Sequence, residues 1–255
     1  MDLLDPDAVA TPAFVLEAAY PAGEGAWHVH RRAQLVHADE GVVTVETREA
    51  SFVAPPERAV WIPPGHTHRV RARRAYRLTT LYVEPSRSPS AEARVVSVDP
   101  LARELLRAAA KLGHAFADVG PEARLVAVLL DRLPTLDVLP SLRLERPRDE
   151  ALAKVVAALE ADPADTRTLA EHAASVALGE KTFARRFAAE TGQSFGRWRQ
   201  QHRLIAALER LGEGESVTEV AFAVGYADVS SFIAAFKAAF GETPARYFAL
   251  RQPTA

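Results

Sequence analysis

Residues 223–247, AVGYADVSSFIAAFKAAFGETPARY, decide the fold of the C-terminal half of the chain. A Gly-Tyr-Ala-Asp turn is followed by Phe232 and Phe236, which are four positions apart. Side chains at i and i+4 lie on one face of an α-helix, so these two rings predict a helix with a buried face. Gly241 ends that helix and Pro244 begins another. The stretch therefore predicts a turn followed by two helices.

The same arrangement occurs 49 positions earlier in the chain. The corresponding pairs are Phe183 and Phe232, Phe187 and Phe236, Gly192 and Gly241, and Trp198 and Tyr247. Each copy has a short first helix, a tight turn and a second helix with two buried phenylalanines, which is the order of a helix-turn-helix unit. A helical bundle with two similar hairpins is the alternative, but such a bundle does not explain why all four pairs are separated by the same 49 positions. The repeat therefore predicts two helix-turn-helix units.

The segment after residue 149 is predicted to be almost entirely helical. The spacing of apolar residues places helices at 150–161, 167–176, 180–190, 194–211, 216–223, 229–240 and 244–250. The long helix 194–211 links the two units and holds them rigidly apart. Asp228 is a good N-cap, because its side chain accepts hydrogen bonds from free backbone N–H groups, whereas Gly179 at the matching place is weaker. The turn of the second copy is expected to be one residue longer.

The helix faces opposite the phenylalanines are candidate DNA contacts. They comprise Lys181, Thr182, Ala184, Arg185 and Arg186 in the first copy, and Val229, Ser230, Ile233, Ala234 and Lys237 in the second. Between Lys181 and Arg210 the chain has seven Lys or Arg and two Glu, a charge near +5 within a chain of net charge −2. A phosphate backbone attracts such a patch, and arginine pairs with guanine edges in the major groove. A solvated helix face is the alternative for the charge taken alone.

The C-terminal segment resembles the AraC/XylS transcription regulators. The motifs that carry the resemblance are TLAEHA at 168–173, FARRFAAETGQSF at 183–195, RLIAAL at 203–208, VTEVAFAVGY at 217–226 and SF-x3-FK-x2-FG-x-TP-x2-Y at 231–247. The resemblance implies two units that contact successive major-groove segments on one face of DNA. The base contacts that it implies are Lys181, Ala184, Arg185, Val229, Ser230 and Ala234. Gly179 stands where the family usually has a serine N-cap that contacts phosphate.

The same resemblance implies the partners of the protein. They are double-stranded promoter DNA, a small-molecule effector, a second copy of the chain in a homodimer, and RNA polymerase if the protein is an activator. Effector binding has to favour one arrangement of the chain's domains, since a ligand shifts an equilibrium only by its differential affinity.

Residues 12–84 are predicted to form β-strands. Segments rich in β-branched and aromatic residues lie at 13–16, 34–37, 41–47, 59–62 and 78–83, separated by glycine and proline. Many short strands at even spacing favour a small barrel or sandwich. Two amphipathic helices follow, the first capped by Asp99 and ending near Gly113, the second beginning at Pro121. Their apolar faces require cover from the β domain or from a partner subunit.

Two segments with paired histidines mark the β domain, WHVHRRAQL at 27–35 and WIPPGHTH at 61–68. On a regular strand His28, His30 and Gln34 point to the same side. The two segments resemble the cupin barrel, whose motifs are His-x-His with a later Glu and Pro-x-Gly-x2-His. With APPERAVWIPPG at 54–65, they also resemble a cupin-bearing subgroup of the same regulators.

The cupin resemblance implies a pocket in the β domain. Its expected effector contacts are Trp27, His28, His30, Gln34, Trp61 and His68, and the metal ligands that it implies are His28, His30, Gln34 and His68. Imidazoles are good ligands for Zn, Ni, Fe or Mn. Glutamine in the place of the family's carboxylate removes a negative charge and weakens such a site. Histidines that hydrogen-bond an organic effector or the core are the alternative.

The predicted architecture is therefore an α+β chain of several domains. A cupin-like β-barrel that binds the effector covers residues 1–95, a helical dimerisation segment covers 96–135, a linker covers 136–149, and a DNA-binding domain with two helix-turn-helix units covers 150–255. The expected function is a sequence-specific transcription regulator whose cupin domain senses a small molecule.

Composition excludes several other classes. The 255 residues include no cysteine, which excludes disulfides and thiolate metal sites. Apolar runs are too short for a membrane span and the acidic N-terminus is not a signal peptide, so we expect a cytoplasmic protein. No phosphate loop, Gly-x-Ser-x-Gly motif or suitably spaced carboxylate pair indicates catalysis. We expect no enzyme, and a metal-dependent cupin enzyme with a helical appendage is the alternative.

Overall fold

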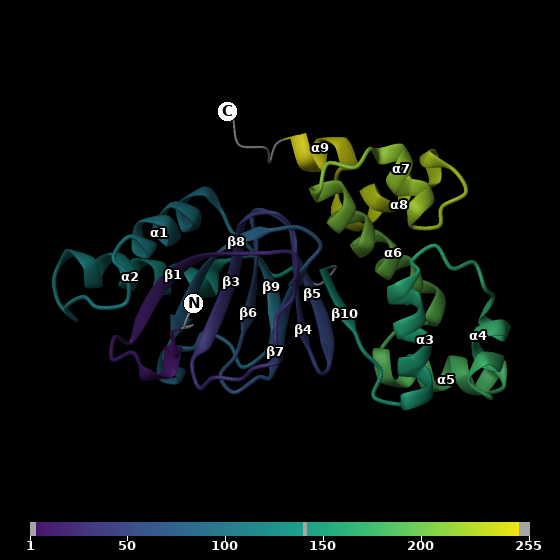
Figure 1. The fold of residues 1–255 in the computed structure, drawn as a ribbon, viewed down its shortest axis with the longest axis horizontal. Helices are drawn as coiled ribbons and strands as arrows, with labels where there is room; N and C mark the ends of the chain where they lie inside the picture. The colour runs from purple at the N-terminus through teal and green to yellow at the C-terminus, as the bar shows by residue number, and fades with distance from the viewer. Residues whose placement is uncertain (1–3, 140–141, 250–255) are drawn as a thin grey trace. The chain divides into compact units, whose positions relative to one another are not determined.

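The computed structural model describes residues 4–139 and 142–249, which form two compact units (Figure 1). The division falls after Arg143 and places the short segment Arg48–Ser51 with the C-terminal unit. Within the described residues, no helix is long and apolar enough to cross a membrane. Each unit has its own buried core, so each is described by itself.

The described strands form two five-stranded sheets, which lie almost entirely in the N-terminal unit. The first has the order β1 (Ala13–Tyr20), β8 (Tyr76–Val83), β3 (Ala33–Glu40), β6 (Arg58–Ile62), β9 (Arg94–Ser97). The second has the order β10 (Arg143–Glu145), β5 (Ala50–Ala54), β4 (Val43–Thr47), β7 (His68–Ala72), β2 (Gly23–Glu24). The strand pairs of the first sheet are antiparallel, as are β4 with β7 and β2 with β7. This is the antiparallel cupin-like domain that the sequence predicts.

Two helices cover one face of the first sheet. They are α1 (Pro100–Ala110) and α2 (Pro121–Arg132), and Figure 1 shows both beside β1. Asp99 caps α1 by accepting a hydrogen bond from the backbone N–H of Ala102, as expected. Leu106 of α1 and Leu129 of α2 belong to the buried hydrophobic cluster between these helices and the sheet. The β domain itself therefore covers the apolar faces of these helices, although Leu101 and Val128 stay exposed.

Residues 28–34 do not form the one regular strand on which the shared side of His28, His30 and Gln34 was considered. His28 forms only an isolated bridge to His68, and β3 does not begin until Ala33. The chain bends at Arg31 and Arg32, where the carboxylate of Asp7 accepts hydrogen bonds from both backbone N–H groups, at 2.8 and 3.3 Å. Those donors are therefore not available to a sheet ladder.

Among the described residues, five strands lie outside the segments singled out from the sequence. These are β2, β5, β7, β9 and β10. Strand β5 follows the turn at 48–49, which has no glycine or proline, and β7 alternates arginine with apolar residues. Residues 136–149, expected as a linker, contain β10 and a bridge between Val138 and Val96.

The C-terminal unit is helical, and its helices match the predicted ranges to within two residues at each end. They are α3 (Glu150–Ala161), α4 (Leu169–Ser175), α5 (Glu180–Thr191), α6 (Phe195–Gly212), α7 (Val217–Ala223), α8 (Val229–Phe240) and α9 (Pro244–Ala249). Helices α4 and α5 form the first hairpin and α7 and α8 the second, with α6 between them in the chain (Figure 1). The connection between α7 and α8 is one residue longer than that between α4 and α5, as predicted.

The repeated phenylalanines form the cores of the two hairpins. Phe183, Phe187, Phe232 and Phe236 are all 0% exposed. The ring of Phe187 lies 5.6 Å from that of Trp198, and the ring of Phe236 lies 5.6 Å from that of Tyr247, both edge to face. Such pairs are favourable beyond the area that they bury. The faces opposite these rings are consequently left to meet solvent or a partner.

Candidate nucleic-acid interface and effector pocket

Both helical hairpins are built in the same way at their first helix. Thr168 and Glu171 form a capping box at the start of α4, and Ser216 and Glu219 form the same box at the start of α7. In each box the hydroxyl accepts a backbone N–H while the carboxylate accepts the N–H of the cap, which satisfies two free donors. The two copies of the sequence repeat thus share the same capping hydrogen bonds.

The turns that follow also share a hydrogen bond. The N–H of Leu178 donates to the carbonyl of Ala173 at 2.9 Å, and the N–H of Tyr226 donates to the carbonyl of Ala221 at 3.0 Å. The residue before each donor has a positive φ, which is 56° at Ala177 and 83° at Gly225. Two hairpins with this turn and these caps are helix-turn-helix units.

Helix α5 presents cations on its exposed face. Lys181 and Arg185 are exposed, and neither has an ion pair or side-chain hydrogen bond in the described part of the chain. Thr182 and Ala184 are half-buried beside them. Arg186 is exposed as well, but its guanidinium lies 3.2 Å from the Asp149 carboxylate at the start of α3. The positive charge of Arg186 is therefore partly neutralised within the protein.

Helix α8 presents a less charged face. Ser230, Ala234 and Lys237 are exposed, whereas Val229 is half-buried. Asp228 begins the helix, because its carboxylate accepts hydrogen bonds from the N–H and the hydroxyl of Ser231, at 2.8 and 2.7 Å. The expectation for this N-cap is confirmed. Gly179, at the start of α5, makes no side-chain cap, as expected.

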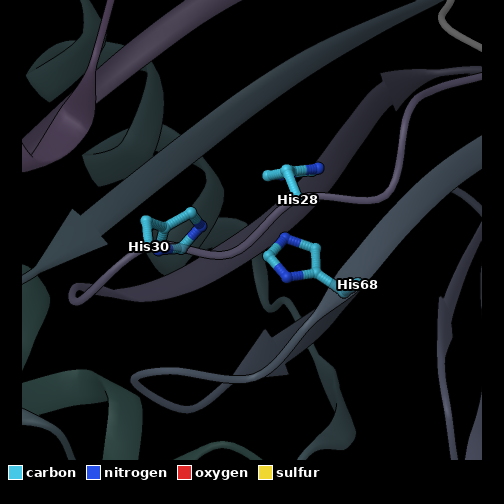
Figure 2. A group of neighbouring side chains, drawn as sticks. All are labelled: His28, His30 and His68. Carbon is cyan, nitrogen blue, oxygen red and sulfur yellow. The ribbon is translucent and has the colours of Figure 1, made fainter.

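Three histidines of the N-terminal unit lie together, as Figure 2 shows for His28, His30 and His68. One ring nitrogen from each lies within 4.8 Å of those of the other two. His30 and His68 are buried and His28 is exposed. The amide oxygen of Gln34 lies 3.1 Å from Nε2 of His30 and 2.7 Å from Nε2 of His68. Burial lowers the pKa of His68 to about 3, so this ring is neutral near neutral pH.

Each of these rings is held at Nδ1 by a backbone carbonyl. The carbonyls are those of Ala26 for His28 (3.0 Å), Arg32 for His30 (2.7 Å) and His66 for His68 (2.8 Å). A carbonyl only accepts, so Nδ1 carries the proton and Nε2 of a neutral ring keeps its lone pair. At His30 and His68 that lone pair faces the amide oxygen of Gln34, which is also an acceptor. A cation or a donor is needed between them.

The donor set fits a divalent transition metal. Imidazole Nε2 atoms whose Nδ1–H groups are fixed on carbonyls are the usual metal-binding arrangement of histidine. A rotated Gln34 amide also satisfies the geometry: its NH2 then donates to both rings, and the hydroxyl of Tyr82, now 3.3 Å from the amide nitrogen, donates to its oxygen. Burial raises the pKa of Tyr82 to about 12, so its hydroxyl keeps its proton. Tyr82 lies directly opposite Gln34 in the pairing of β3 with β8.

The two tryptophans expected in the pocket lie in different places. Trp61 is 2% exposed and belongs to the core between the first sheet and the helices, and its indole N–H donates to the carbonyl of Ser90. Gln34 is paired with Ile62, and side chains alternate along a strand, so Trp61 points to the opposite face. The structure therefore separates Trp61 from the histidines. Trp27 is half-buried beneath the guanidinium of Arg69, 4.9 Å from the ring centre.

Comparison with known proteins agrees with this architecture. Residues 11–177 match the model of the AraC-like ligand binding domain, and residues 172–249 match a helix-turn-helix domain. The chain therefore belongs to the AraC-type family of helix-turn-helix transcriptional regulators.

Among its relatives, the chain is 33% identical over 243 residues to the HTH-type transcriptional regulator NimR of Escherichia coli K12, covering 94% of this chain and 88% of NimR. It is 37% identical over 117 residues to the regulator RipA of Corynebacterium glutamicum, covering 46% of this chain and 33% of RipA. Among solved structures, the DNA-binding domain of AdpA in complex with a target DNA is 28% identical, with a TM-score of 0.39 over 42% of this chain and 100% of that domain.

Proposed function

We propose that α5 and α8 enter successive major-groove segments on one face of promoter DNA, and that the N-terminal unit controls this binding in response to a small molecule. The observation that carries the proposal is a pair of cations, Lys181 and Arg185, that have no partner among the described residues and lie in a hairpin whose aromatic core and turn recur in the hairpin of α8. Side chains that find no partner within the protein are available to a polyanion.

The side chains on the two helices suit different tasks. Arg185 can form two parallel hydrogen bonds to a guanine, and Lys181 and Lys237 can neutralise phosphates or contact base edges. Ala184 and Ala234 are short enough to let the helix backbone approach the groove. Val229 and Ser230, at the start of α8, suit a thymine methyl and a base edge.

DNA binding is tested by gel shift with the region upstream of the protein's own gene. We expect a complex that survives an excess of unrelated competitor DNA, because base contacts add to the sequence-independent phosphate attraction. Equal affinity for the upstream region and for a scrambled sequence of the same length and composition would exclude sequence-specific binding.

The remaining assignments extend this proposal. The effector binds beside His28, His30 and Gln34, and it shifts the protein toward the arrangement with higher affinity for DNA or away from it. The exposed Leu101 and Val128 of α1 and α2 support contact with a second copy of the chain. The protein acts on the chromosome in the cytoplasm, and contacts RNA polymerase if it activates transcription.

A second proposal concerns the histidine cluster. We infer that His28, His30, His68 and the amide oxygen of Gln34 hold a divalent transition metal such as Zn, Ni, Fe or Mn. The specific observation in its favour is that three Nδ1–H groups are fixed on carbonyls while two Nε2 lone pairs face another acceptor. A bound metal supplies a positive charge and open coordination positions for an anionic or amine effector. Turnover of a substrate by the metal-loaded protein would instead support the enzyme alternative.

Metal binding is tested by equilibrium dialysis of the full chain against Zn²⁺ or Ni²⁺, followed by elemental analysis. We expect about one ion per chain, and a loss of affinity of at least about tenfold in His68→Ala, because one ligand of the donor set is removed. The matched control is His66→Ala, whose ring lies outside the cluster and whose backbone carbonyl still holds His68.

A further variant separates the two arrangements of the Gln34 amide. Gln34→Glu should tighten metal binding by at least about tenfold, since a carboxylate adds the missing negative charge. A wild-type protein that takes up no metal, together with a Gln34→Glu variant that does, would assign the rotated, metal-free network to the natural chain.

A further inference from the structure

Arg203 lies near the middle of α6, the helix that links the two helix-turn-helix units. Its guanidinium donates three hydrogen bonds to backbone carbonyls: Nε to Pro163 at 3.2 Å, Nη2 to Asp165 at 2.7 Å and Nη1 to Gly225 at 2.9 Å. The side chain is half-buried, and this burial lowers the pKa of Arg203, although an arginine stays protonated. In the sequence Arg203 counts as part of a basic patch, but in the structure its donors are occupied within the protein.

The three acceptors belong to two separate parts of the DNA-binding unit. Pro163 and Asp165 lie in the loop that leads into α4, the first helix of the first hairpin. Gly225 lies in the turn between α7 and α8, in the second hairpin. The loop is itself fixed, because the carboxylate of Asp165 accepts the N–H of Arg167 at 2.8 Å. One planar guanidinium thus joins both hairpins to the helix between them.

The contact between Arg203, the loop before α4 and the turn between α7 and α8 leaves no room for a side chain at Gly225. A Cβ placed there would lie 2.8 Å from Nη2 of Arg203 and 3.0 Å from Cα of Ala164. The turn alone does not require glycine, since Ala177 occupies the matching place in the first hairpin with a φ of 56°. The glycine therefore marks the close approach of Arg203 and of the loop before α4.

We propose that Arg203 is a positioning residue that fixes the separation and relative orientation of the two DNA-reading helices, and thereby the spacing of the two DNA segments that the protein accepts. The inference rests on the proposed DNA binding. Successive major-groove segments on one face of a duplex are about 10 base pairs apart, so a change in the angle between the hairpins moves one helix out of its groove. Lysine has a single ammonium group and cannot reproduce a planar fork of three donors.

The test compares DNA duplexes in which the two segments of the recognised site are moved apart or together by one or two base pairs. Wild-type protein should prefer one spacing by about tenfold or more. Arg203→Lys should bind DNA of that spacing at least about fivefold more weakly than wild type. Its preference for that spacing over the others should be less than about threefold. Its affinity for DNA with only one intact segment should stay within about twofold of wild type, which also shows that the variant is folded.

Two further variants make the result decisive. Gly225→Ala should reduce the spacing preference in the same way, because it disturbs the same contact while Arg203 itself is kept. Arg210→Lys is the control on the same helix, where the cation pairs with Glu215 at 2.9 Å, and it should keep the wild-type preference.

The outcomes distinguish this inference from the proposed function. Wild-type preference for one spacing, retained in Arg203→Lys, overturns the positioning role alone. An equal loss by Arg203→Lys on intact and one-segment DNA also overturns it, since that pattern indicates a phosphate contact. A wild-type protein that binds no DNA specifically overturns the proposed function and this inference together.

Discussion

Replacing Phe187 with alanine should destabilise the helical unit by about 3–5 kcal/mol, the usual cost of removing a buried aromatic ring. Phe187 is 0% exposed, and its ring centre lies 5.8 Å from that of Phe183, 5.3 Å from that of Phe195 and 5.6 Å from that of Trp198. Its removal leaves a cavity among three aromatic side chains that belong to α5 and α6. Rigid aromatic rings cannot close such a cavity without moving the helices.

The measurement is urea unfolding followed by circular dichroism at a helix-sensitive wavelength. Phe222→Ala is the matched control, because the same residue type on α7 is 53% exposed and should lose less than about 1 kcal/mol. Similar losses in the two variants would contradict the assignment of Phe187 to a packed core. DNA binding by Phe187→Ala should fall with the folded fraction.

Replacing Arg185 with alanine should weaken specific DNA binding by about 1–3 kcal/mol and relax the preference at one base pair. Arg185 is exposed on α5, and within the described part of the chain nothing neutralises its charge. Its neighbour Ala184 is small, so the helix can approach a groove closely enough for a bidentate contact. The effect is measured as the ratio of dissociation constants on the recognised site and on a set of single-base variants of that site.

Arg186→Ala is the matched control for Arg185→Ala. Its guanidinium lies 3.2 Å from the Asp149 carboxylate, so it should affect DNA binding less and without changing base preference. Unchanged binding by Arg185→Ala would remove this residue from the base contacts. A uniform loss across all base variants would assign it to the phosphate backbone instead.

The helical half follows from local signals in the sequence. Phenylalanines at i and i+4, a proline at the start of a helix and Asp228 as N-cap each act within one or two turns, so the ends of α5 and α8 could be predicted to about one residue. The capping boxes at Thr168 and Ser216 are equally local. The 49-residue repeat extended these signals to the whole unit.

The β unit depends on contacts between distant residues. The break before β3 comes from Asp7, which binds the backbone of Arg31 and Arg32 from 24 and 25 positions away. Trp61 lies on the far side of its strand because of the pairing of Gln34 with Ile62. Neither effect leaves a pattern in the nearby sequence. The break at residues 31–32 could therefore not be predicted, and Trp61 was expected in the pocket although it lies on the opposite face of its strand.

The contacts of two residues in the candidate sites could not be predicted from the sequence for a similar reason. Tyr82 contacts Gln34 only because β8 pairs with β3 in one register, and its position in an alternating strand is the only signal. Arg203 binds carbonyl groups, which every residue possesses, so no partner residue type identifies it. The histidine cluster could be predicted because its motif spacing resembles a known barrel, although residues 28–34 do not form one regular strand.

Hydroxyl-radical footprinting of the full-length protein on its own upstream DNA tests the pairing of the two helix-turn-helix units most directly. The proposed function predicts two protected segments about 10 base pairs apart on one face of the duplex, with the segment contacted by α5 weakened in Arg185→Ala and the other weakened in a Ser230 or Lys237 variant. A single protected segment, or two segments on opposite faces of the duplex, would contradict it.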